Sequence, residues 1–430
     1  MVKKVGVAIL GLGVVGGGTY QTLVEHRDFY METQQVDITV EKVLDLNLER
    51  LKQLGVPDEA IAKNIEEVVA SPTVDIVIET IGGIGVAKTF VTAALRNGKT
   101  VVTSNKELIC KFSHELEKLA KRNHCGLYYE ASCVGGVPII RTLLDGVQGN
   151  CIKSMMGIVN GTTNYILTKM TYEGANYADV LKEAQKLGYA EANPSADVDG
   201  FDSMYKLSIL SSMAFHTKIP YTKIFREGIS GINVKDIAYG RELGYTLKLL
   251  AIGKNNGKHV EVRVHPTFIP CEHPLASVND SFNAVYLTGD AVGDVMLYGR
   301  GAGALPTASA VVSDVIYAAT HTEIKYSTFK NNATADADVK FVSDFESAYY
   351  LRLSVSDKAG VLAKISGMFA KHGVSIVKVS QLPKEDAENG GEVTLIIVTH
   401  KTTENSVKNV VAKIDASELG NVDSVIRVEQ

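Results

Sequence analysis

The stretch VGVAILGLGVVG, Val5 to Gly16, joins a short apolar run to glycines spaced as Gly-x-Gly-x-x-Gly. The run Val5–Leu10 is typical of a strand buried on both faces, and a helical stretch reaching about His26 follows the glycines. In such a unit the first glycine permits a tight turn, the second lets backbone approach a pyrophosphate, and the third lets helix pack on strand. The stretch predicts a dinucleotide-binding unit, and a glycine-rich turn that binds nothing is the alternative.

Further strand and helix patterns alternate after this unit. Apolar runs recur at Ile38–Leu44, Val74–Ile78 and Val101–Thr103. Helical segments such as Glu59–Val69 and Val86–Arg96 separate them. Regular alternation of this kind predicts an α/β fold with a doubly wound parallel sheet, the Rossmann type.

The carboxyl ends of these strands carry the candidate cofactor ligands, because open α/β sheets hold ligands at that edge. Asp45 ends the second strand, where a carboxylate can bind the ribose hydroxyls of NAD and would repel the 2′-phosphate of NADP. Lys42 and Arg50 are close enough in sequence to keep NADP use open. ETIGG (Glu79–Gly83) follows the third strand and TSNK (Thr103–Lys106) the fourth. The predicted cofactor-binding residues are Gly11, Leu12, Gly13, Val14, Val15, Gly16, Asp45, Thr80, Gly82, Thr103, Ser104, Asn105, Lys106 and Gly303.

The bulk composition limits the class of protein. A length of 430 residues suggests about three domains, and 45% hydrophobic with 22% charged residues is typical of soluble globular proteins. With 49 acidic and 44 basic residues the net charge is −5, which gives no reason to expect nucleic acid or a membrane surface as a partner. No apolar run approaches the roughly 18 residues of a membrane span. The five cysteines form no CxxC pair, which indicates reduced thiols in a cytoplasmic protein.

The segment AQKLGYAEANPSADVDGFDSMYK, Ala184 to Lys206, places several carboxylates between two predicted helices. Gly188 can end the first helix with a left-handed turn, and Gly200 precedes the second. Asp202 and Lys206 are four residues apart on the second helix and therefore share a face, although a solvated ion pair is the alternative for these two alone. The segment resembles the signature of homoserine dehydrogenases, matching it at Ala184, Gly188, Tyr189, Ala190, Asn193, Pro194, Asp197, Gly200, Asp202 and Lys206.

The resemblance implies a reversible NAD(P)-dependent interconversion of L-aspartate 4-semialdehyde and L-homoserine. Reducing an aldehyde requires an acid, or a fixed positive charge, at the carbonyl oxygen. The TSNK stretch is similar to one whose lysine is catalytic in the family, which indicates Lys106, and Lys206 is the second catalytic candidate. The resemblance does not settle which of the two donates the proton. Glu191 and Asp202 match family positions that hold the substrate ammonium, and Leu46 stands where many relatives have arginine, which favours NAD.

A second substrate-binding candidate is the stretch GIVNGTTNY, Gly157 to Tyr165. An apolar strand ends at Asn160 and Gly161, and Thr162 can cap the helix that follows. Free N–H groups there, together with the Asn and Thr side chains, are candidates for binding a substrate carboxylate or the nicotinamide carboxamide. A capped helix without a ligand is the alternative. Asp197 and Asp199 are expected to structure the intervening loop.

A cation site is implied at EASCVGGVP, Glu130 to Pro138, which resembles the family's bend out of the nucleotide domain. Relatives hold a monovalent cation, sodium or potassium, near this bend with a glutamate and backbone carbonyls. By position the implied ligands are Glu130 and the carbonyls of Cys133, Gly135 and Val137. Oxygen ligands suit a hard cation, and a glycine turn with one buried carboxylate is the alternative.

The glycine-rich stretch Tyr298–Gly303 precedes a predicted helix over Thr307–Tyr317, which suggests that the chain returns to the nucleotide site. In the family this segment closes the first domain. We therefore expect a nucleotide domain over 1–132 plus about 300–322, an inserted α+β substrate and dimerisation domain over 133–299, and a linker over 323–348. A regulatory domain over 349–430 completes this prediction.

The C-terminal pattern predicts a βαββαβ unit of the ferredoxin type, with its elements at Tyr350–Ser356, Val361–Phe369, Val374–Ser380, Val393–Thr399, Glu404–Ile414 and Asp423–Val428. It resembles an ACT domain in this order and in its DKAGVL turn. Such domains bind amino acids at a dimer interface near that turn, which implies threonine, the pathway end product, as effector. The candidate effector residues are Asp357, Gly360 and Val361, and a purely structural dimerisation role is the alternative.

Two other functions are the alternatives. Another two-domain oxidoreductase, such as one acting on sugars, does not account for Ala184–Lys206. A catalytically inactive amino-acid sensor is opposed by the intact Lys106, Asp202 and Lys206. The sequence shows no aspartokinase-like extension, so we expect a single activity, in a homodimer or homotetramer.

Overall fold

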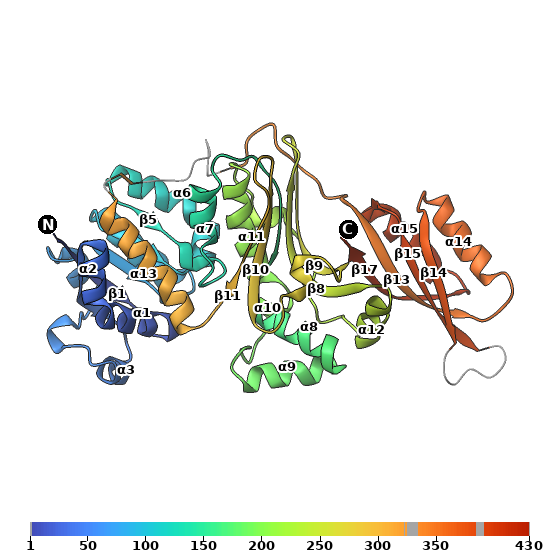
Figure 1. The fold of residues 1–430 in the computed structure, drawn as a ribbon, viewed down its shortest axis with the longest axis horizontal. Coiled ribbons are helices and arrows are strands. Elements are labelled where there is room, and N and C mark those ends of the chain that lie inside the picture. The colour runs from blue at the N-terminus through green and yellow to red at the C-terminus, as the bar shows by residue number, and fades with distance from the viewer. Residues whose placement is uncertain (1, 322, 325–333, 384–390, 430) are drawn as a thin grey trace.

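The computed structural model describes residues 2–321, 323–324, 334–383 and 391–429. Figure 1 shows three parts arranged along the long axis of the molecule, blue at the N-terminus, green to yellow in the middle and red at the C-terminus. The orange helix α13 (Ala304–Thr320) lies back among the blue elements. None of the helices in this described part is long and apolar enough to cross a membrane.

The N-terminal sheet has five strands in the order β2-β1-β3-β4-β5, and all neighbours are parallel. The strands are β1 (Lys3–Leu10), β2 (Val36–Leu44), β3 (Ile76–Glu79), β4 (Thr100–Thr103) and β5 (Leu127–Tyr128). The chain order reverses between β1 and β3, so the loops that follow these two strands diverge and leave a crevice. The Rossmann-type fold predicted from the glycine-rich turn is confirmed.

Helices cover both faces of this sheet: α1 (Val14–Glu25), α2 (Arg27–Gln34), α3 (Leu48–Gln53), η1 (Asp58–Ala60), α4 (Ile65–Ala70), α5 (Gly85–Arg96) and α6 (Lys106–Arg122). The continuous helix predicted over Glu59–Val69 is wrong. A bridge between Val43 and Ile61 draws the chain to the sheet edge, and α4 begins only after Asn64, whose side chain accepts the backbone N–H of Glu67.

Helix α13 completes the nucleotide-binding part. Its buried side chains, among them Val311 and Val315, share one apolar core with Val7 of β1. It packs closely on α1, because a Cβ added at Gly18 would lie 2.8 Å from the carbonyl oxygen of Ala304. The chain therefore returns to this sheet, as the sequence predicts. The domain limits drawn from the sequence stay a prediction.

The middle part is an antiparallel sheet with helices on one face. Its elements are η2 (Glu130–Ser132), α7 (Ile139–Arg141), η3 (Thr142–Gly146), β6 (Ile152–Ile158), α8 (Gly161–Glu173), α9 (Tyr177–Lys186), α10 (Ser195–Val198), α11 (Phe201–Ala214), η4 (Tyr221–Lys223), β7 (Phe225–Arg226), α12 (Val234–Glu242), β8 (Tyr245–Asn255), β9 (His259–Pro270), η5 (Pro274–Ser277), β10 (Phe282–Gly289) and β11 (Gly293–Arg300). The strand order is β11-β10-β6-β8-β9, and α8 and α11 pack on this sheet.

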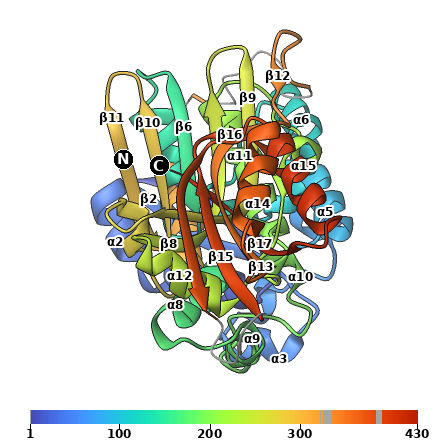
Figure 2. The same ribbon diagram turned by 90° about the vertical axis from the view of Figure 1, so that its right-hand side faces the viewer.

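The C-terminal part has the predicted βαββαβ order. Its elements are β12 (Lys340–Phe341), β13 (Glu346–Ser356), α14 (Val361–Lys371), β14 (Ile376–Pro383), β15 (Glu392–Thr399), β16 (Thr402–Thr403), α15 (Glu404–Asp415) and β17 (Gly420–Val428). Figure 2 views this part end-on, with α14 and α15 on the same side of the sheet. Part of the predicted linker, residues 325–333, lies outside the described residues. Strand β17 also pairs in parallel with β9, so one twelve-stranded sheet runs through the middle and C-terminal parts.

Candidate active site

A cleft of about 880 Å³ separates the nucleotide-binding part from the middle part. Many of the residues predicted from the sequence line it together: Val14, Val15, Thr80, Gly82, Ser104, Asn105, Lys106, Asn160, Gly161, Thr162, Glu191, Asp202, Lys206 and Gly303. The remaining predicted cofactor residues, Gly11, Leu12, Gly13, Gly16, Asp45 and Thr103, lie in or behind the loops that form its wall. Two sets of candidates that are far apart in sequence thus face one space.

The glycine turn after β1 has the shape that its spacing predicts. Gly11 has a φ of +89°, which side-chain-bearing residues rarely adopt. A Cβ at Gly16 would lie 1.9 Å from the carbonyl oxygen of Gly11, so α1 packs against the turn only because this residue is glycine. No atom lies within 4 Å of a Cβ built on Gly13, which leaves open space at the N-terminus of α1. This is where a pyrophosphate can meet free N–H groups.

An anion and a cation flank the same turn. The carboxylate of Asp45 accepts the backbone N–H groups of Leu12 and Asn47. Arg50 donates from Nε to the carbonyl oxygen of Leu12 at 3.3 Å. Leu46, the residue after Asp45, is 99% exposed. A carboxylate and a guanidinium therefore both lie close to the turn.

A buried carboxylate joins the loops after β3 and β4. Glu79 accepts the hydroxyl of Thr103 at 2.6 Å and the backbone N–H of Gly82 at 3.2 Å. Burial raises the pKa of Glu79 above its ordinary value, while these hydrogen bonds oppose the rise. Asn105 caps α6 and donates to the carbonyl oxygen of Gly83. Thr103 thus fixes the wall of the cleft from behind and does not line it.

The centre of the cleft is a carboxylate shared by two ammonium groups. Lys106 Nζ lies 2.8 Å from Asp202 Oδ1, and Lys206 Nζ lies 2.7 Å from Asp202 Oδ2. Lys206 also donates to the carbonyl oxygen of Val159 at 2.7 Å, and the Asn160 amide donates to Asp202 at 2.9 Å. The Asp202 and Lys206 side chains are only 5% and 11% exposed, whereas that of Lys106 is 41% exposed. A solvated i,i+4 ion pair does not describe this buried arrangement.

The charges in this cluster stabilise one another. Burial alone would raise the pKa of the Asp202 carboxyl, but the charges of Lys106 and Lys206 and the Asn160 amide hold it well below its ordinary value. The charge of Asp202 raises the pKa of the Lys106 ammonium. Burial, and then the charge of Asp202, raises the pKa of Asp197. Asp202 is therefore the permanent anion of the site, and Lys106 is kept cationic.

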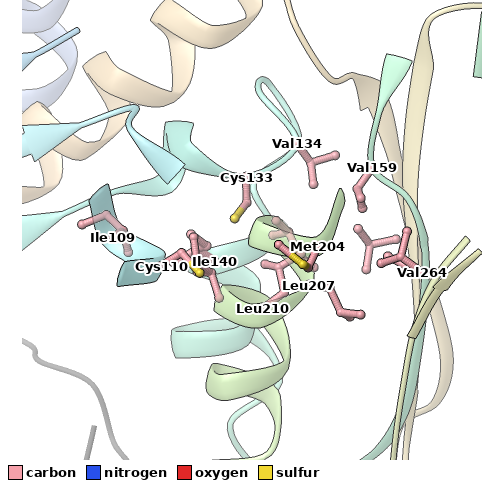
Figure 3. Packing of buried hydrophobic residues seen from close by; sticks show 14 of the residues in the cluster. Ile109, Cys110, Cys133, Val134, Ile140, Val159, Met204, Leu207, Leu210 and Val264 are labelled. Carbon is pink, nitrogen blue, oxygen red and sulfur yellow. The ribbon is translucent and has the colours of Figure 1, made fainter. Parts of the chain in front are cut away.

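An apolar core supports the two polar residues on α11. Met204 lies between Asp202 and Lys206 in sequence, and Leu207 follows Lys206. Figure 3 shows Met204 and Leu207 packed among buried side chains that include Cys133 and Val159. Such close packing holds a helix in one position and excludes water from its inner face. The geometry of the ion-pair cluster is thus set by a rigid element.

The first turn of α8 faces the same space. Asn160 has extended backbone, and its side chain accepts the N–H of Thr163 at 2.9 Å, so Asn160 is the N-cap. The predicted cap by Thr162 is wrong, because Thr162 lies inside the helix and donates its hydroxyl to the carbonyl oxygen of Tyr189. The Asn160 amide also binds Asp197 at 2.7 Å, which links this helix to the loop before α11.

The carboxylates of that loop differ in their surroundings. Glu191 is exposed at the cleft rim. Asp199 accepts the hydroxyl of Ser195 and does not line the cleft, so it structures the loop. Gly188 and Gly200 have φ values of +78° and +81°, in agreement with the left-handed turn predicted after the first helix.

At the bend, Glu130 is buried, and both of its carboxylate oxygens accept backbone N–H groups, from Ile140 at 2.8 Å and from Arg141 at 2.6 Å. The carboxylate therefore caps α7. The carbonyl oxygens of Cys133 and Gly135 accept no hydrogen bond from any residue in the described ranges. Within those ranges no group of three or more His, Cys, Asp or Glu side chains could hold a metal ion. A cation at this bend would therefore depend on carbonyl oxygens.

The three candidate effector residues, Asp357, Gly360 and Val361, line one pocket of about 250 Å³ at the turn between β13 and α14. Gln381 of β14 donates to Asp357 at 3.2 Å and lines the same pocket. Gly360 has a φ of +86° and starts α14. The pocket is remote in sequence from the cleft.

Several residues that line the cleft were not among the sequence candidates, and Ser281 is the one farthest from any motif. Ser281 lines the cleft from the loop before β10. Its carbonyl oxygen would lie 2.8 Å from a Cβ at Gly161, so the loop rests directly on the first turn of α8. No spacing or motif around Ser281 signals this position, because packing alone brings it there.

Comparison with known proteins agrees with this geometry. Family profiles match residues 138–316 (homoserine dehydrogenase), 11–130 (homoserine dehydrogenase, NAD binding domain) and 349–418 (ACT domain). The chain is 41% identical to a homoserine dehydrogenase of Bacillus subtilis over 431 residues, covering 99% of both chains. It is similar to a crystal structure of a homoserine dehydrogenase from Thiobacillus denitrificans, with a TM-score of 0.92, 39% identity, and coverage of 100% of this chain and 99% of that one. It is also similar to a hyperthermophilic archaeal homoserine dehydrogenase in complex with NADPH, with a TM-score of 0.62, 29% identity, and coverage of 73% of this chain and 97% of that one.

Proposed function

The chain belongs to the homoserine dehydrogenase family of NAD(P)-dependent oxidoreductases, and from this premise we propose how its cleft performs the reaction. The substrates are L-aspartate 4-semialdehyde and L-homoserine, an interconversion that serves threonine, methionine and isoleucine biosynthesis. The observation that carries the proposal is the single carboxylate of Asp202 bound on one oxygen to Lys106 and on the other to Lys206.

The two lysines act on the reacting oxygen. The nicotinamide cofactor supplies or accepts the hydride when bound. As the aldehyde is reduced, negative charge grows on its oxygen, and the ammonium groups of Lys106 and Lys206 stabilise that charge, one of them donating the proton. Asp202 and Val159 accept two of the three N–H groups of Lys206, which leaves one for substrate. Asp202 supports this role by favouring the charged form of Lys106.

The two ends of the amino-acid substrate need opposite partners. Glu191, exposed at the rim, and Asp202 provide carboxylates for the substrate ammonium. The first turn of α8, with Asn160, Gly161 and Thr162, provides backbone N–H groups for a substrate carboxylate, because the first N–H groups of a helix have no partner within it.

For the cofactor we propose a preference for NAD, with NADP also accepted. Asp45 lies beside the glycine turn, where its carboxylate can bind the ribose hydroxyls of NAD. Arg50 is the residue that can receive a 2′-phosphate, since its guanidinium reaches the same turn. For a monovalent cation, sodium or potassium, we propose Glu130 and the carbonyl oxygens of Cys133, Gly135 and Val137. Each Glu130 oxygen accepts one backbone N–H and keeps a lone pair, and the Val137 carbonyl accepts the N–H of Ile139.

For regulation we propose that threonine binds the pocket at Asp357, Gly360 and Val361 and inhibits turnover. A pocket of this size suits one amino acid, and the ACT-type profile covers it. The chain is expected to act as a homodimer or homotetramer. A purely structural role of this domain in dimerisation predicts no effect of threonine on the rate.

The direct test follows nicotinamide absorbance with purified protein, L-homoserine, and either NAD or NADP. Homoserine-dependent reduction is the expected result. The faster cofactor tests the role of Asp45, and replacing sodium and potassium by choline tests the cation. An intact folded sample that turns over with neither cofactor in the presence of monovalent salt overturns the proposed reaction.

A further inference from the structure

Arg427 of β17 ties the C-terminal part of the chain to the middle part. Its side chain is only 6% exposed. Nε and Nη2 bind the two oxygens of Glu404 at 3.0 and 2.6 Å within the C-terminal part. Nη1 binds Glu227 of the middle part at 2.6 Å. The guanidinium is planar, and Glu404 fixes it through two nitrogens. The third nitrogen, Nη1, therefore has a fixed direction, and Glu227 binds a rigid partner.

Glu227 belongs to a short irregular segment, Glu227–Ile229, that follows β7. The backbone N–H of Glu227 donates to the carbonyl oxygen of Val264 on β9 at 2.8 Å. Two residues later, Ile229 donates to the carbonyl oxygen of Val198 at the same distance. At Gly228 a Cβ would lie 2.3 Å from that Val198 oxygen, so the segment presses directly on α10.

The segment Glu227–Ile229 contacts Val198 at the end of α10. We call α10 and the two residues after it, Ser195–Gly200, the substrate loop. Within it Asp197 lines the cleft and binds the Asn160 amide. The loop ends at Gly200, the left-handed N-cap of α11, so its position sets that of the first turn of α11, which carries Asp202. Arg226, adjacent to Glu227, donates to the carbonyl oxygen of Asp199 and holds the other side of the loop.

We propose that Arg427 is a positioning residue for the substrate site, acting through Glu227 on the substrate loop. The inference rests on the proposed function, since it assigns that loop to the homoserine site. The C-terminal part then contributes to the placement of Asp197 and Asp202 in the absence of any effector, in addition to whatever regulation it provides.

The test uses the full-length chain and the variants Glu227→Ala, Arg427→Met and their combination. Glu227→Ala is the primary variant, because the Glu227 side chain is 44% exposed and its removal leaves the buried Arg427–Glu404 pair intact. We expect KM for homoserine to rise about fivefold in each single variant, with kcat changed less than about twofold, as for a lost binding contact. KM for the cofactor should stay at the wild-type value.

The matched control is Lys254→Met. Lys254 also binds the C-terminal part, at Glu429, with a similarly exposed side chain, but it does not contact the substrate loop. Arg263 continues to hold Glu429 in this variant. We expect Lys254→Met to leave KM for homoserine unchanged, even if Tm falls.

The double variant separates positioning from general loosening. If Arg427 acts through Glu227, the combined substitution raises KM no further than either single one. An additive effect, an unchanged KM in Glu227→Ala, or an equal rise of KM in Lys254→Met would each overturn the proposal. Failure of the proposed function is distinguishable, because the wild-type protein would then show no homoserine-dependent turnover at all.

Discussion

The ammonium nitrogen of Lys106 lies 2.8 Å from Oδ1 of Asp202, so the first turn of α6 and the first turn of α11 meet across the cleft. One residue comes from the nucleotide-binding part and the other from the middle part. The contact therefore bridges the two walls of the cleft. Lys206 binds the opposite oxygen of the same carboxylate, and the site behaves as one charged unit.

Removing either lysine should lower kcat much more than it changes cofactor binding. Lys106→Ala and Lys206→Ala each remove a positive charge from the reacting oxygen, and we expect kcat to fall by about a hundredfold or more. Steady-state kinetics, with cofactor binding followed by fluorescence, provides the measurement. Near-normal turnover in both variants would contradict the assignment.

Replacing Asp202 by asparagine should move the alkaline limb of the rate profile to lower pH. The charge of Asp202 raises the pKa of Lys106, so the wild-type ammonium stays protonated above the range of an ordinary lysine. Without that charge Lys106 loses its proton at a lower pH, and activity that requires the cation falls earlier. Profiles of kcat from pH 7 upward for both proteins give the comparison. Coincident alkaline limbs would show that Lys106 protonation does not limit turnover.

Asp45→Ala should ease the use of NADP. The substitution removes the carboxylate that would repel a 2′-phosphate, while Arg50 remains beside the glycine turn. We expect KM for NADP to fall relative to KM for NAD, by about tenfold for one lost charge contact. Arg50→Gln is the matched control and should change the ratio in the opposite sense. Unchanged relative KM values in Asp45→Ala would count against the assignment.

Substitution in the C-terminal pocket should abolish the effect of threonine without altering basal turnover. Gly360 starts α14 from a left-handed conformation, and Asp357 carries the only acidic side chain that lines this pocket in the described residues. Asp357→Ala is expected to make the rate insensitive to threonine at concentrations that inhibit the wild type. Inhibition that persists unchanged would place the effector elsewhere.

Much of the fold follows from local patterns. The glycine turn after β1 and the helix from Val361 are predictable because neighbouring residues determine them. The helix over Glu59–Val69 failed because a distant strand, through Val43, competes for the chain at Ile61. A local sequence pattern cannot reveal a partner that is distant in sequence.

The site divides in the same way. Motifs indicate Lys106, Asp202 and Lys206, but the sharing of one carboxylate by both lysines depends on how the nucleotide-binding part packs on the middle part. Ser281 is not predictable from the sequence, because only its packing on Gly161 brings it to the cleft. The pairing of β17 with β9 was likewise invisible, since nothing in either strand identifies the other.

The return of α13 to the first sheet has a consequence for synthesis on the ribosome. Val311 and Val315 complete the core around Val7, yet they emerge only after the whole middle part has been translated. Until the inserted residues have left the exit tunnel, the N-terminal sheet lacks α13 and part of its apolar face stays uncovered. A pause or fault in the middle segment would leave the nascent chain without its last core helix.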